Sequence, residues 1–332
     1  MKVLVTGGSG FLGSHIAEQL TREGHVVRAL VRKSSNRKLL ESLSSVELVE
    51  GSVEDVASLE RAVKGVDAIV HSAGLVKARN IDEFTACNVT GTTNLLDAAK
   101  AAQKNGPPGL KRFVFVSSLA AVGPSLDGAP VASDRAPSPV THYGRSKLAA
   151  ERAVLAAKND LPVTIIRPPL IYGPRDNETF AFFQSIARGI LPVLGDGKNT
   201  LSVIYVEDAA AACVRAVEAD VPSGSTYFVD DGEVHVWKEA LADVEDALGK
   251  RAFIRFGLPL GVMRAAAMAT EAYGRMNNKA VMLTRDKINE LEQKHWVCSS
   301  LDTRRDLGWT PAVGWREGTK RAARWYRDNG WL

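Results

Sequence analysis

Short apolar runs alternate with longer segments of helical periodicity through the first half of the chain. The short runs predict buried strands at Val26–Val31, Val46–Val49, Ala68–Val70, Phe113–Val116 and Val163–Ile166. Between them, apolar residues at helical spacing predict helices around 36–43, 55–63, 80–103 and 142–158. Strands that alternate with helices form a parallel sheet with helices on both faces. The pattern therefore predicts an α/β protein built on a doubly wound parallel sheet.

A glycine-rich turn follows the first apolar run and leads into a helical pattern. Unpaired N–H groups and the helix dipole at such a helix start attract phosphate. Gly7 can take the positive φ of a tight turn, Gly10 lets a pyrophosphate approach, and Gly13 lets the helix pack on the strand. The turn predicts the dinucleotide site of a Rossmann-type sheet; the alternative is a structural strand–helix turn. The residues expected at the phosphates are Gly7, Gly10, Phe11, Leu12 and Gly13.

Beyond about residue 170 the alternation stops, and proline and glycine become frequent. One apolar run, Leu201–Val206, leads into an alanine-rich helix for which Asp208 is the expected N-cap. We predict a dinucleotide-binding Rossmann domain at 1–170, its sheet completed by part of 200–230. Residues 171–332 are then mainly a smaller C-terminal substrate lobe.

Small and polar residues follow three of the predicted strands. Ala73 and Gly74 come after one strand, the pair at 117–118 after the next, and Pro168 after the third. Parallel sheets bind ligands beyond the C-terminal ends of their strands. We therefore expect these residues to lie along one edge, beside the glycine turn.

Tyr143 and Lys147 are four residues apart on a predicted helix and so share one face. Tyrosine has an ordinary pKa of about 10, which makes it a poor base at neutral pH. A nearby lysine and a positively charged nicotinamide would favour the phenolate and lower this pKa. Tyr143 could then relay a proton to or from a substrate oxygen while hydride moves at the adjacent carbon. The alternative is an ordinary surface turn of a helix.

Ser117 and Ser118 end the strand that precedes this helix. A hydroxyl there could hydrogen-bond the reacting oxygen and orient it toward Tyr143. Adjacent strand residues face opposite ways, so the choice between the two serines stays open; we favour Ser118. The alternative is that both only cap the strand. His71, at the end of another strand, is expected to pack rather than to transfer protons.

These motifs together resemble the extended short-chain dehydrogenase/reductases. The resemblance rests on Gly7-x-x-Gly10-x-x-Gly13, Ser118, Tyr143-x-x-x-Lys147, the Asn88-Val-x-Gly segment and Arg167-Pro168. Residues 117–124 and 307–311 look most like the 3β-hydroxysteroid dehydrogenase/dihydroflavonol reductase branch, which acts on apolar alcohols and ketones. The resemblance implies Ser-Tyr-Lys catalysis, a dinucleotide on the glycine turn, cofactor contacts around Asn88 and Pro168, and a homodimer through the helices at 80–103 and 142–158.

Two departures from the family pattern affect the cofactor. Members commonly carry an aspartate near the adenine, where this chain has Ser52 followed by Val53. An NAD-type chain would also carry an acidic residue after the second strand to bond the ribose 2′-hydroxyl. Arg32 and Lys33 stand there instead and suit a 2′-phosphate. We therefore favour NADP(H) over NAD(H); a solvated basic loop is the alternative.

The function that these residues predict is an NADP-dependent oxidoreductase. It would transfer a hydride between the nicotinamide and a carbonyl or hydroxyl carbon of a small apolar molecule of steroid, flavonoid or polyketide type. The enzymatic alternative is a nucleotide-sugar epimerase or dehydratase, with Arg175, Arg188 and Lys198 as candidate diphosphate contacts. A non-catalytic dinucleotide-sensing module is the alternative from another class.

Composition limits the partners and the compartment. A net charge of +4 over 332 residues indicates no nucleic-acid surface. The three cysteines, at 87, 213 and 298, lack paired ligand spacing and predict neither a disulfide frame nor a metal site. No signal peptide precedes the first strand, so we expect a cytoplasmic protein. Leu258–Met276 contains three charges and predicts an amphipathic helix rather than a membrane span, with peripheral membrane contact as the alternative.

Overall fold

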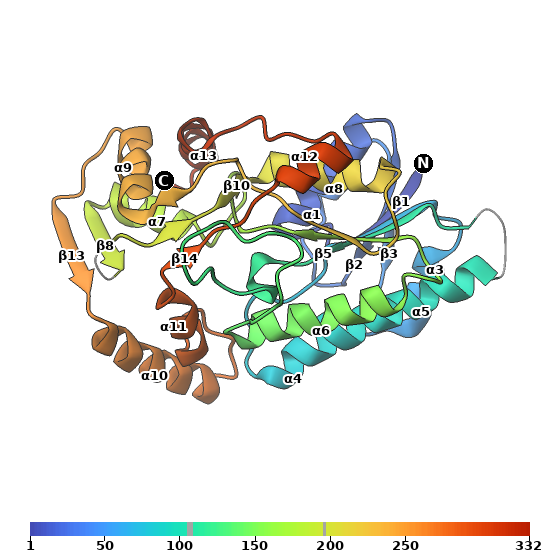
Figure 1. The fold of residues 1–332 in the computed structure, drawn as a ribbon, viewed down its shortest axis with the longest axis horizontal. Helices are drawn as coiled ribbons and strands as arrows, with labels where there is room; N and C mark the ends of the chain where they lie inside the picture. The colour runs from blue at the N-terminus through green and yellow to red at the C-terminus, as the bar shows by residue number, and fades with distance from the viewer. Residues whose placement is uncertain (105–108, 195–196) are drawn as a thin grey trace.

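The computed structural model describes residues 1–104, 109–194 and 197–332. Its centre is a seven-stranded sheet with the order β11-β6-β5-β4-β1-β2-β3, and every neighbouring pair is parallel (Figure 1). The strands are β1 (Lys2–Thr6), β2 (Val26–Val31), β3 (Val46–Glu50), β4 (Ala68–His71), β5 (Arg112–Val116), β6 (Val163–Arg167) and β11 (Ser225–Phe228). This confirms the predicted α/β fold with a Rossmann-type parallel sheet.

Helices cover both faces of the sheet. One face packs against α1 (Phe11–Arg22) and α8 (Val206–Glu218), which contact each other closely. The other face packs against α3 (Val56–Val63), α5 (Gly91–Lys104) and α6 (His142–Ala156), and α5 and α6 run side by side below the sheet in Figure 1. The short helices α2 (Lys38–Ser42) and α12 (Leu301–Leu307) lie on the side of α1 and α8. Burial of apolar side chains on both faces holds this layered arrangement together.

The helix predicted at 80–103 consists of three parts in the structure. A short α4 (Ile81–Phe84) continues into a π-helical turn at Thr85–Thr90 and then into α5. A π-helical turn carries one extra residue and often marks a functional site. Here it contains Asn88, which is buried.

The second half of the chain builds a smaller unit beside the sheet. Its strands are β7 (Leu170–Tyr172), β8 (Ile190–Leu194), β9 (Thr200–Leu201), β10 (Val203–Tyr205), β12 (His235–Val236), β13 (Ile254–Leu258) and β14 (His295–Trp296). Its helices are α7 (Phe180–Ala187), α9 (Trp237–Leu248), α10 (Leu260–Met276), α11 (Arg285–Leu291) and α13 (Trp315–Asp328). Large aromatic side chains from β7, α7, β10 and α13 fill its core, among them Tyr172, Phe183, Tyr205 and Tyr326.

Two expectations for this half were wrong in detail. The strand expected at Leu201–Val206 is divided at Ser202 into β9 and β10, which belong to different sheets. Asp208 is not an N-cap: α8 begins at Val206, and the Asp208 carboxylate accepts hydrogen bonds from the backbone amides of Ala312 and Val313. Asp208 therefore fastens the segment before α13 to α8.

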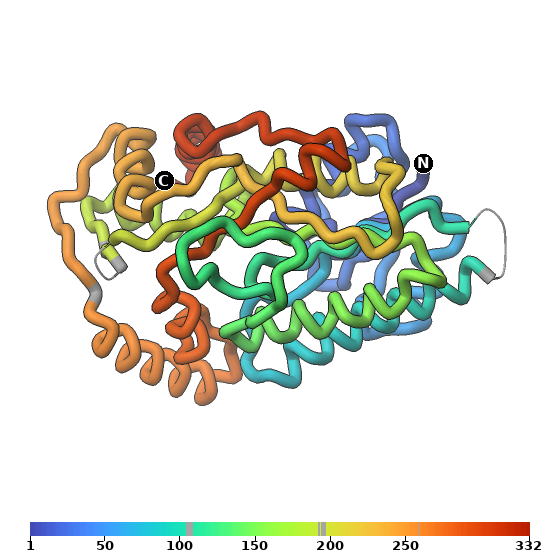
Figure 2. Tube along the Cα trace, viewed as in Figure 1, coloured from blue at the N-terminus to red at the C-terminus, as the bar shows by residue number. Residues whose placement is uncertain are grey.

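The C-terminal part of the chain passes from the second half to the edge of the sheet and back (Figure 1). Figure 2 shows it passing from α11 through β14 to α12 beside the sheet and then returning to α13. The contacts of α12 with β11 and α8 link the two halves of the chain. Among the described residues, no helix combines the length and the apolarity needed to cross a bilayer.

Candidate active site

The tight turn after β1 requires glycine at two positions, Gly7 and Gly13. Gly7 has φ +74, and Gly10 donates its N–H to the Gly7 carbonyl at 2.8 Å. A Cβ at Gly13 would lie 2.1 Å from the Gly7 oxygen, which is far inside van der Waals contact. No side chain caps the start of α1. The first N–H groups of a twelve-residue helix are therefore directed toward the carboxyl end of the sheet, as an anion site requires.

A large cavity opens beside this turn. Its volume is about 1950 Å³, whereas a typical single-ligand pocket has about 300–1,000 Å³. Predicted site residues from five segments of the chain line it: Phe11, Leu12, Gly74, Ser117, Ser118, Tyr143 and Pro168. The cavity extends to α10 and α11 and so joins the end of the sheet to the second half of the chain. The other residues expected at the cofactor are not among those that line it: Gly7, Gly10, Gly13, Arg32, Lys33, Ser52, Val53, Ala73, Asn88 and Lys147.

Tyr143 and Ser118 lie at the wall of this cavity, and Lys147 lies one helical turn beyond Tyr143 on α6. Thr141 caps α6 by accepting a hydrogen bond from Gly144, so the first turn of the helix holds Tyr143. Ser118 lies two residues beyond the end of β5, where it caps the turn Leu119–Ala121, and its hydroxyl hydrogen-bonds the Tyr143 phenol. Its hydroxyl also accepts the Ala120 N–H at 3.1 Å. The serine that contacts Tyr143 is thus the one that the sequence favoured.

The pKa of the Tyr143 phenol is raised, whereas the sequence predicted a lowered pKa. Burial raises its pKa to about 12, a hydrogen bond from Ser118 offsets part of this rise, and the charge of Glu290 adds to it. The expected lowering of this pKa depends on Lys147 together with a nicotinamide cation and stays a prediction; among the protein groups alone, desolvation outweighs the other effects. Without a bound cofactor, the raised pKa keeps the Tyr143 phenol protonated at neutral pH.

Lys147 is buried, and its ammonium is hydrogen-bonded to the main chain. Its ammonium donates to the Val116 carbonyl at 2.6 Å and lies 4.4 Å from the centre of the Phe115 ring. Burial lowers its pKa to about 8, while the carboxylate of Glu151 acts in the opposite direction. The ammonium is therefore protonated at neutral pH and loses its proton at about pH 8.

Ser117 supplies an unused hydroxyl to the same cavity. Its side chain is buried, lines the cavity and has no hydrogen-bond partner for Oγ. Buried polar groups are nearly always paired, so an orphaned hydroxyl on a cavity wall indicates a bound group. This observation fits a cofactor or substrate atom placed next to β5.

Asn88 does not line the cavity; its side chain is hydrogen-bonded to the loop that follows β4 and to α6. Its amide oxygen accepts from Leu75 N–H at 2.7 Å, and its amide nitrogen donates to the Leu75 carbonyl and to Ser146 Oγ. These bonds fix the loop after β4, where a Cβ at Gly74 would meet Asn88 Oδ1 at 3.3 Å. Asn88 is therefore a positioning residue for the Ala73–Gly74 loop.

The residues assigned to the far end of the cofactor follow β2 and β3. Arg32 and Lys33 are exposed directly after β2, and the Arg37 side chain bonds the Arg32 carbonyl and Glu50. Ser52 accepts the Glu54 N–H, whereas Val53 turns its side chain inward against Gly91. Because β2 and β3 are parallel to β1 and follow it in the sheet, these four assigned residues lie at the same edge of the sheet as the glycine turn.

Three acidic residues near the tyrosine were missed in the sequence. Glu151 follows Lys147 by one further helical turn and binds Arg167 in a buried two-pronged ion pair at 2.9 and 2.8 Å. Asp286, on α11, accepts the His142 N–H at 2.8 Å and so attaches the second half of the chain to the start of α6. Glu290 acts on Tyr143 by charge. The four-residue spacing of 143, 147 and 151 was a signal for Glu151; nothing local pointed to residues 286 and 290.

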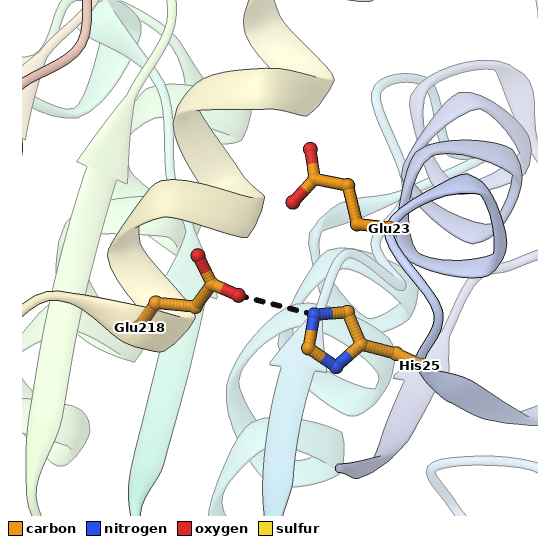
Figure 3. Close-up of side chains that lie close together, drawn as sticks. All are labelled: Glu23, His25 and Glu218. Carbon is orange, nitrogen blue, oxygen red and sulfur yellow. Dashed lines mark hydrogen bonds and ion pairs between the residues drawn. The ribbon is translucent and has the colours of Figure 1, made fainter.

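Two other histidines have structural roles. His71 is buried and hydrogen-bonded to Thr6 and Thr92, with its pKa lowered to about 3 by desolvation, as expected for a packing residue. His25 binds Glu218 at 3.1 Å, and Glu23 lies beside them (Figure 3). The ligand atoms of Glu23, His25 and Glu218 lie within 4.8 Å of one another. This cluster joins the C-terminal ends of α1 and α8, remote from the glycine turn at the other end of α1.

Comparison with known proteins identifies the family. The family model for the NAD dependent epimerase/dehydratase family matches residues 3–229. The chain belongs to this family. A ceramide reductase from Caulobacter vibrioides is 35% identical over 335 residues, covering 99% of this chain and 96% of that protein. A 2-alkyl-3-oxoalkanoate reductase from Stenotrophomonas maltophilia is 31% identical over 338 residues, covering 97% and 98%.

A solved structure extends this family assignment. A double mutant of DesIV, a dTDP-glucose 4,6-dehydratase from Streptomyces venezuelae with NAD bound, has a TM-score of 0.79 and 25% identity, covering 100% of this chain and 99% of that one. The protein is thus an NAD(P)-dependent oxidoreductase of the extended short-chain dehydrogenase/reductase type.

Proposed function

We propose that this family member reduces the carbonyl group of a small apolar molecule with a hydride from NADPH. The observation that supports this most directly is the neutral phenol of Tyr143, bonded to Ser118, on the wall of the cavity that begins at the glycine turn. Reduction needs a group that gives a proton to the carbonyl oxygen, and a phenol with a pKa of about 12 stays protonated for that task.

The residues around the cavity fit a dinucleotide. Gly7, Gly10 and Gly13 form a cradle that a Cβ would fill, and the orphaned Ser117 hydroxyl lies farther along the same edge. We assign the phosphates to the glycine turn with Phe11 and Leu12, the adenine end to Ser52 and Val53, and the nicotinamide end to Ala73, Gly74, Ser117, Lys147 and Pro168. When bound, the cofactor supplies the hydride.

The side chains of the protein carry the proton. Ser118 and Tyr143 donate hydrogen bonds to the carbonyl oxygen, which places the carbonyl carbon and polarises the C=O bond. As the carbon receives the hydride, the Tyr143 O–H bond breaks and its proton goes to the oxygen, giving an alcohol. The charge of Lys147 stabilises the phenolate that is left until solvent returns a proton.

The cavity has a set of apolar lining residues that suits an apolar substrate. Apolar side chains from α4, α7, α10 and the loop before α11 line it: Phe84, Phe182, Val262, Met263, Ala266 and Leu283. The two reductase relatives are named for a ceramide and an oxoalkanoate, both with apolar chains. Neither Arg175 nor Arg188 is among the described residues that line the cavity, and Arg175 pairs with Glu18. Other cations do line the cavity, among them Lys77, Arg79 and Arg275, so the substrate panel has to separate an apolar substrate from a nucleotide sugar.

The test of this function is a substrate panel read by nicotinamide absorbance. Long-chain ketones and 3-oxoesters should be reduced, whereas UDP- and dTDP-hexoses should neither turn over nor bind. Turnover of a nucleotide sugar without net change of the cofactor would instead establish an epimerase or dehydratase. Cofactor binding without any hydride transfer would establish the sensing module.

The cofactor proposal predicts a preference that depends on Arg32. The wild type should have the higher kcat/KM with NADPH, because Arg32 and Lys33 follow β2 where an acidic residue would select NADH. Arg32→Gln should lower kcat/KM for NADPH by about tenfold to a hundredfold, because it removes a charged hydrogen bond to the 2′-phosphate. NADH lacks this phosphate, so kcat/KM for NADH should be unchanged. Arg61→Gln, on α3, is the matched control. A wild-type preference for NADH would contradict the proposal.

The pH profile of reduction should follow Lys147. Because burial lowers the Lys147 pKa to about 8, its ammonium is present below that pH and is lost above it. The kcat/KM, which reports the free enzyme, should be level between pH 6 and 7 and decrease above about pH 8 by up to about tenfold per pH unit. Stopped-flow or steady-state rates with NADPH measure this. A profile that is level to pH 10, or that rises, would exclude the assigned role of Lys147.

The remaining expectations stay proposals. We propose the domain division near residue 170 with the modification that α8, β11 and α12 contribute to the Rossmann unit. The homodimer through α5 and α6 is likewise a proposal, which analytical ultracentrifugation tests.

A further inference from the structure

Helix α10 has apolar residues on two opposite faces. Its inward face packs on α11 through Met263 and Ala267 and also lines the cavity. Its outward face follows the helical pattern i, i+3, i+4, i+7, i+11 and consists of Ala265, Met268, Ala269, Ala272 and Met276, all exposed. The outward face of an ordinary surface helix is polar. We call these five outward residues the α10 patch.

Exposed apolar side chains are concentrated around this patch. Among the described residues, nine of the seventeen exposed large hydrophobic side chains lie between residues 250 and 287. Met276 is 87% exposed and Met268 is 57% exposed on the patch itself, and Phe253 is 79% exposed beside β13. Strand β13 leads directly to α10 at the same end of the molecule (Figure 1). Concentrated exposed apolar surface of this kind marks an interaction site.

The same segment is strongly basic. Residues 250–287 contain eight lysines and arginines and two acidic residues, a formal charge of +6, whereas the whole chain has +4. Glu245, Asp246 and Glu292 form ion pairs with three of these arginines. Glu290 also pairs with Lys287, so counting these four carboxylates as well leaves a formal charge of +2. The patch is therefore apolar and surrounded by excess positive charge.

We propose that the α10 patch docks on an anionic lipid bilayer. An exposed apolar helical face flanked by cations lies in the interface plane of such a membrane, where the methionines reach the acyl chains and the cations meet lipid phosphates. A second copy of this chain is the less suitable occupant, because a twofold contact would place two positive patches against each other.

If α10 lies on the bilayer, the cavity lies directly behind this helix. The inward face of α10 contributes Val262, Met263 and Ala266 to the cavity wall, so one helix separates the cavity from the proposed lipid surface. A ligand with an apolar chain could then enter from the bilayer without crossing water. This route rests on the proposed function, whereas the docking itself does not.

Vesicle flotation tests the docking. The wild-type protein should float with vesicles of phosphatidylcholine and phosphatidylglycerol in equal amounts, bind weakly to phosphatidylcholine alone, and be released by high salt. The double variant Met268→Glu/Met276→Glu should bind the mixed vesicles at least about tenfold more weakly. The matched control, Leu126→Glu/Leu301→Glu, changes two equally exposed residues outside the segment and should bind as the wild type does.

Three results would overturn the proposal. They are a wild type that does not float with the anionic vesicles, a control that loses binding as the double variant does, and a wild-type dimer that the double variant dissociates without any vesicle binding. Reduction of a short, water-soluble ketone with NADPH is measured in parallel on the same variants. Because Met268 and Met276 do not line the cavity, that rate should be unchanged, so a failed reaction and a failed docking are told apart.

Discussion

Replacing Tyr143 with phenylalanine should lower kcat for carbonyl reduction by about 10²–10⁴-fold, the range that general acid–base groups contribute. The phenol donates the proton that the substrate oxygen takes, and phenylalanine keeps the ring beside Phe84 while removing the only proton donor on it. The affinity for NADPH should stay within a few-fold, because the glycine turn and Lys147 are unchanged. Steady-state kinetics and a fluorescence titration with NADPH measure the two quantities.

Tyr227→Phe is the matched control for this variant. Tyr227 also has a hydrogen-bonded hydroxyl, to Asp306 at 3.2 Å, but it is not among the residues lining the cavity. Its loss should leave kcat unchanged. A Tyr143→Phe enzyme with nearly normal kcat would refute the assigned role. If kcat survives in Tyr143→Phe but is lost in Ser118→Ala, the serine is the proton donor instead.

Replacing Gly13 with alanine should weaken NADPH binding by at least about a hundredfold, because a displacement of about 1 Å in a positioned site has effects of this size. The new Cβ would lie 2.1 Å from the Gly7 oxygen and 2.6 Å from the Gly7 carbonyl carbon. Backbone atoms cannot move aside as a flexible side chain can, so the turn must open and its N–H groups lose their common direction. Isothermal titration calorimetry with NADPH measures the change.

Gly8→Ala provides the comparison within the same turn. A Cβ there would meet the Ala29 side chain at 3.4 Å, an ordinary contact. This variant should bind NADPH nearly as the wild type does. Thermal unfolding of both variants separates a damaged turn from an unfolded chain. Equal affinities of Gly13→Ala and Gly8→Ala would show that the turn does not hold the cofactor.

The sequence was sufficient where the chemistry depends on local order. The alternation of strands and helices predicted the parallel sheet because burial of apolar faces is periodic along the chain. The glycine spacing at 7, 10 and 13 predicted the turn because steric limits act between neighbours. The spacing of Tyr143 and Lys147 placed both on one side of α6 because a helix repeats every 3.6 residues.

The sequence was misleading where a local rule competed with a distant contact. Asp208 has the residue type of an N-cap, yet the segment before α13 supplies two amides that its carboxylate binds instead. The bonds of Asn88 to Leu75 and Ser146 were likewise not predictable from its motif, and its place at the cofactor stays a prediction. A side chain takes the best partners available in three dimensions, and those partners come from any part of the chain.

The sequence by itself determined the Rossmann-type sheet, the glycine turn and the Ser-Tyr-Lys set, because each depends on residue type and spacing within a short segment. Only the tertiary structure decided which serine contacts Tyr143, that burial keeps the phenol neutral, and that the Lys147 ammonium rests on the Val116 carbonyl. It also decided that α10 presents one apolar face to the cavity and another to solvent. Desolvation and exposure depend on everything packed around a group, and no local pattern contains that sum.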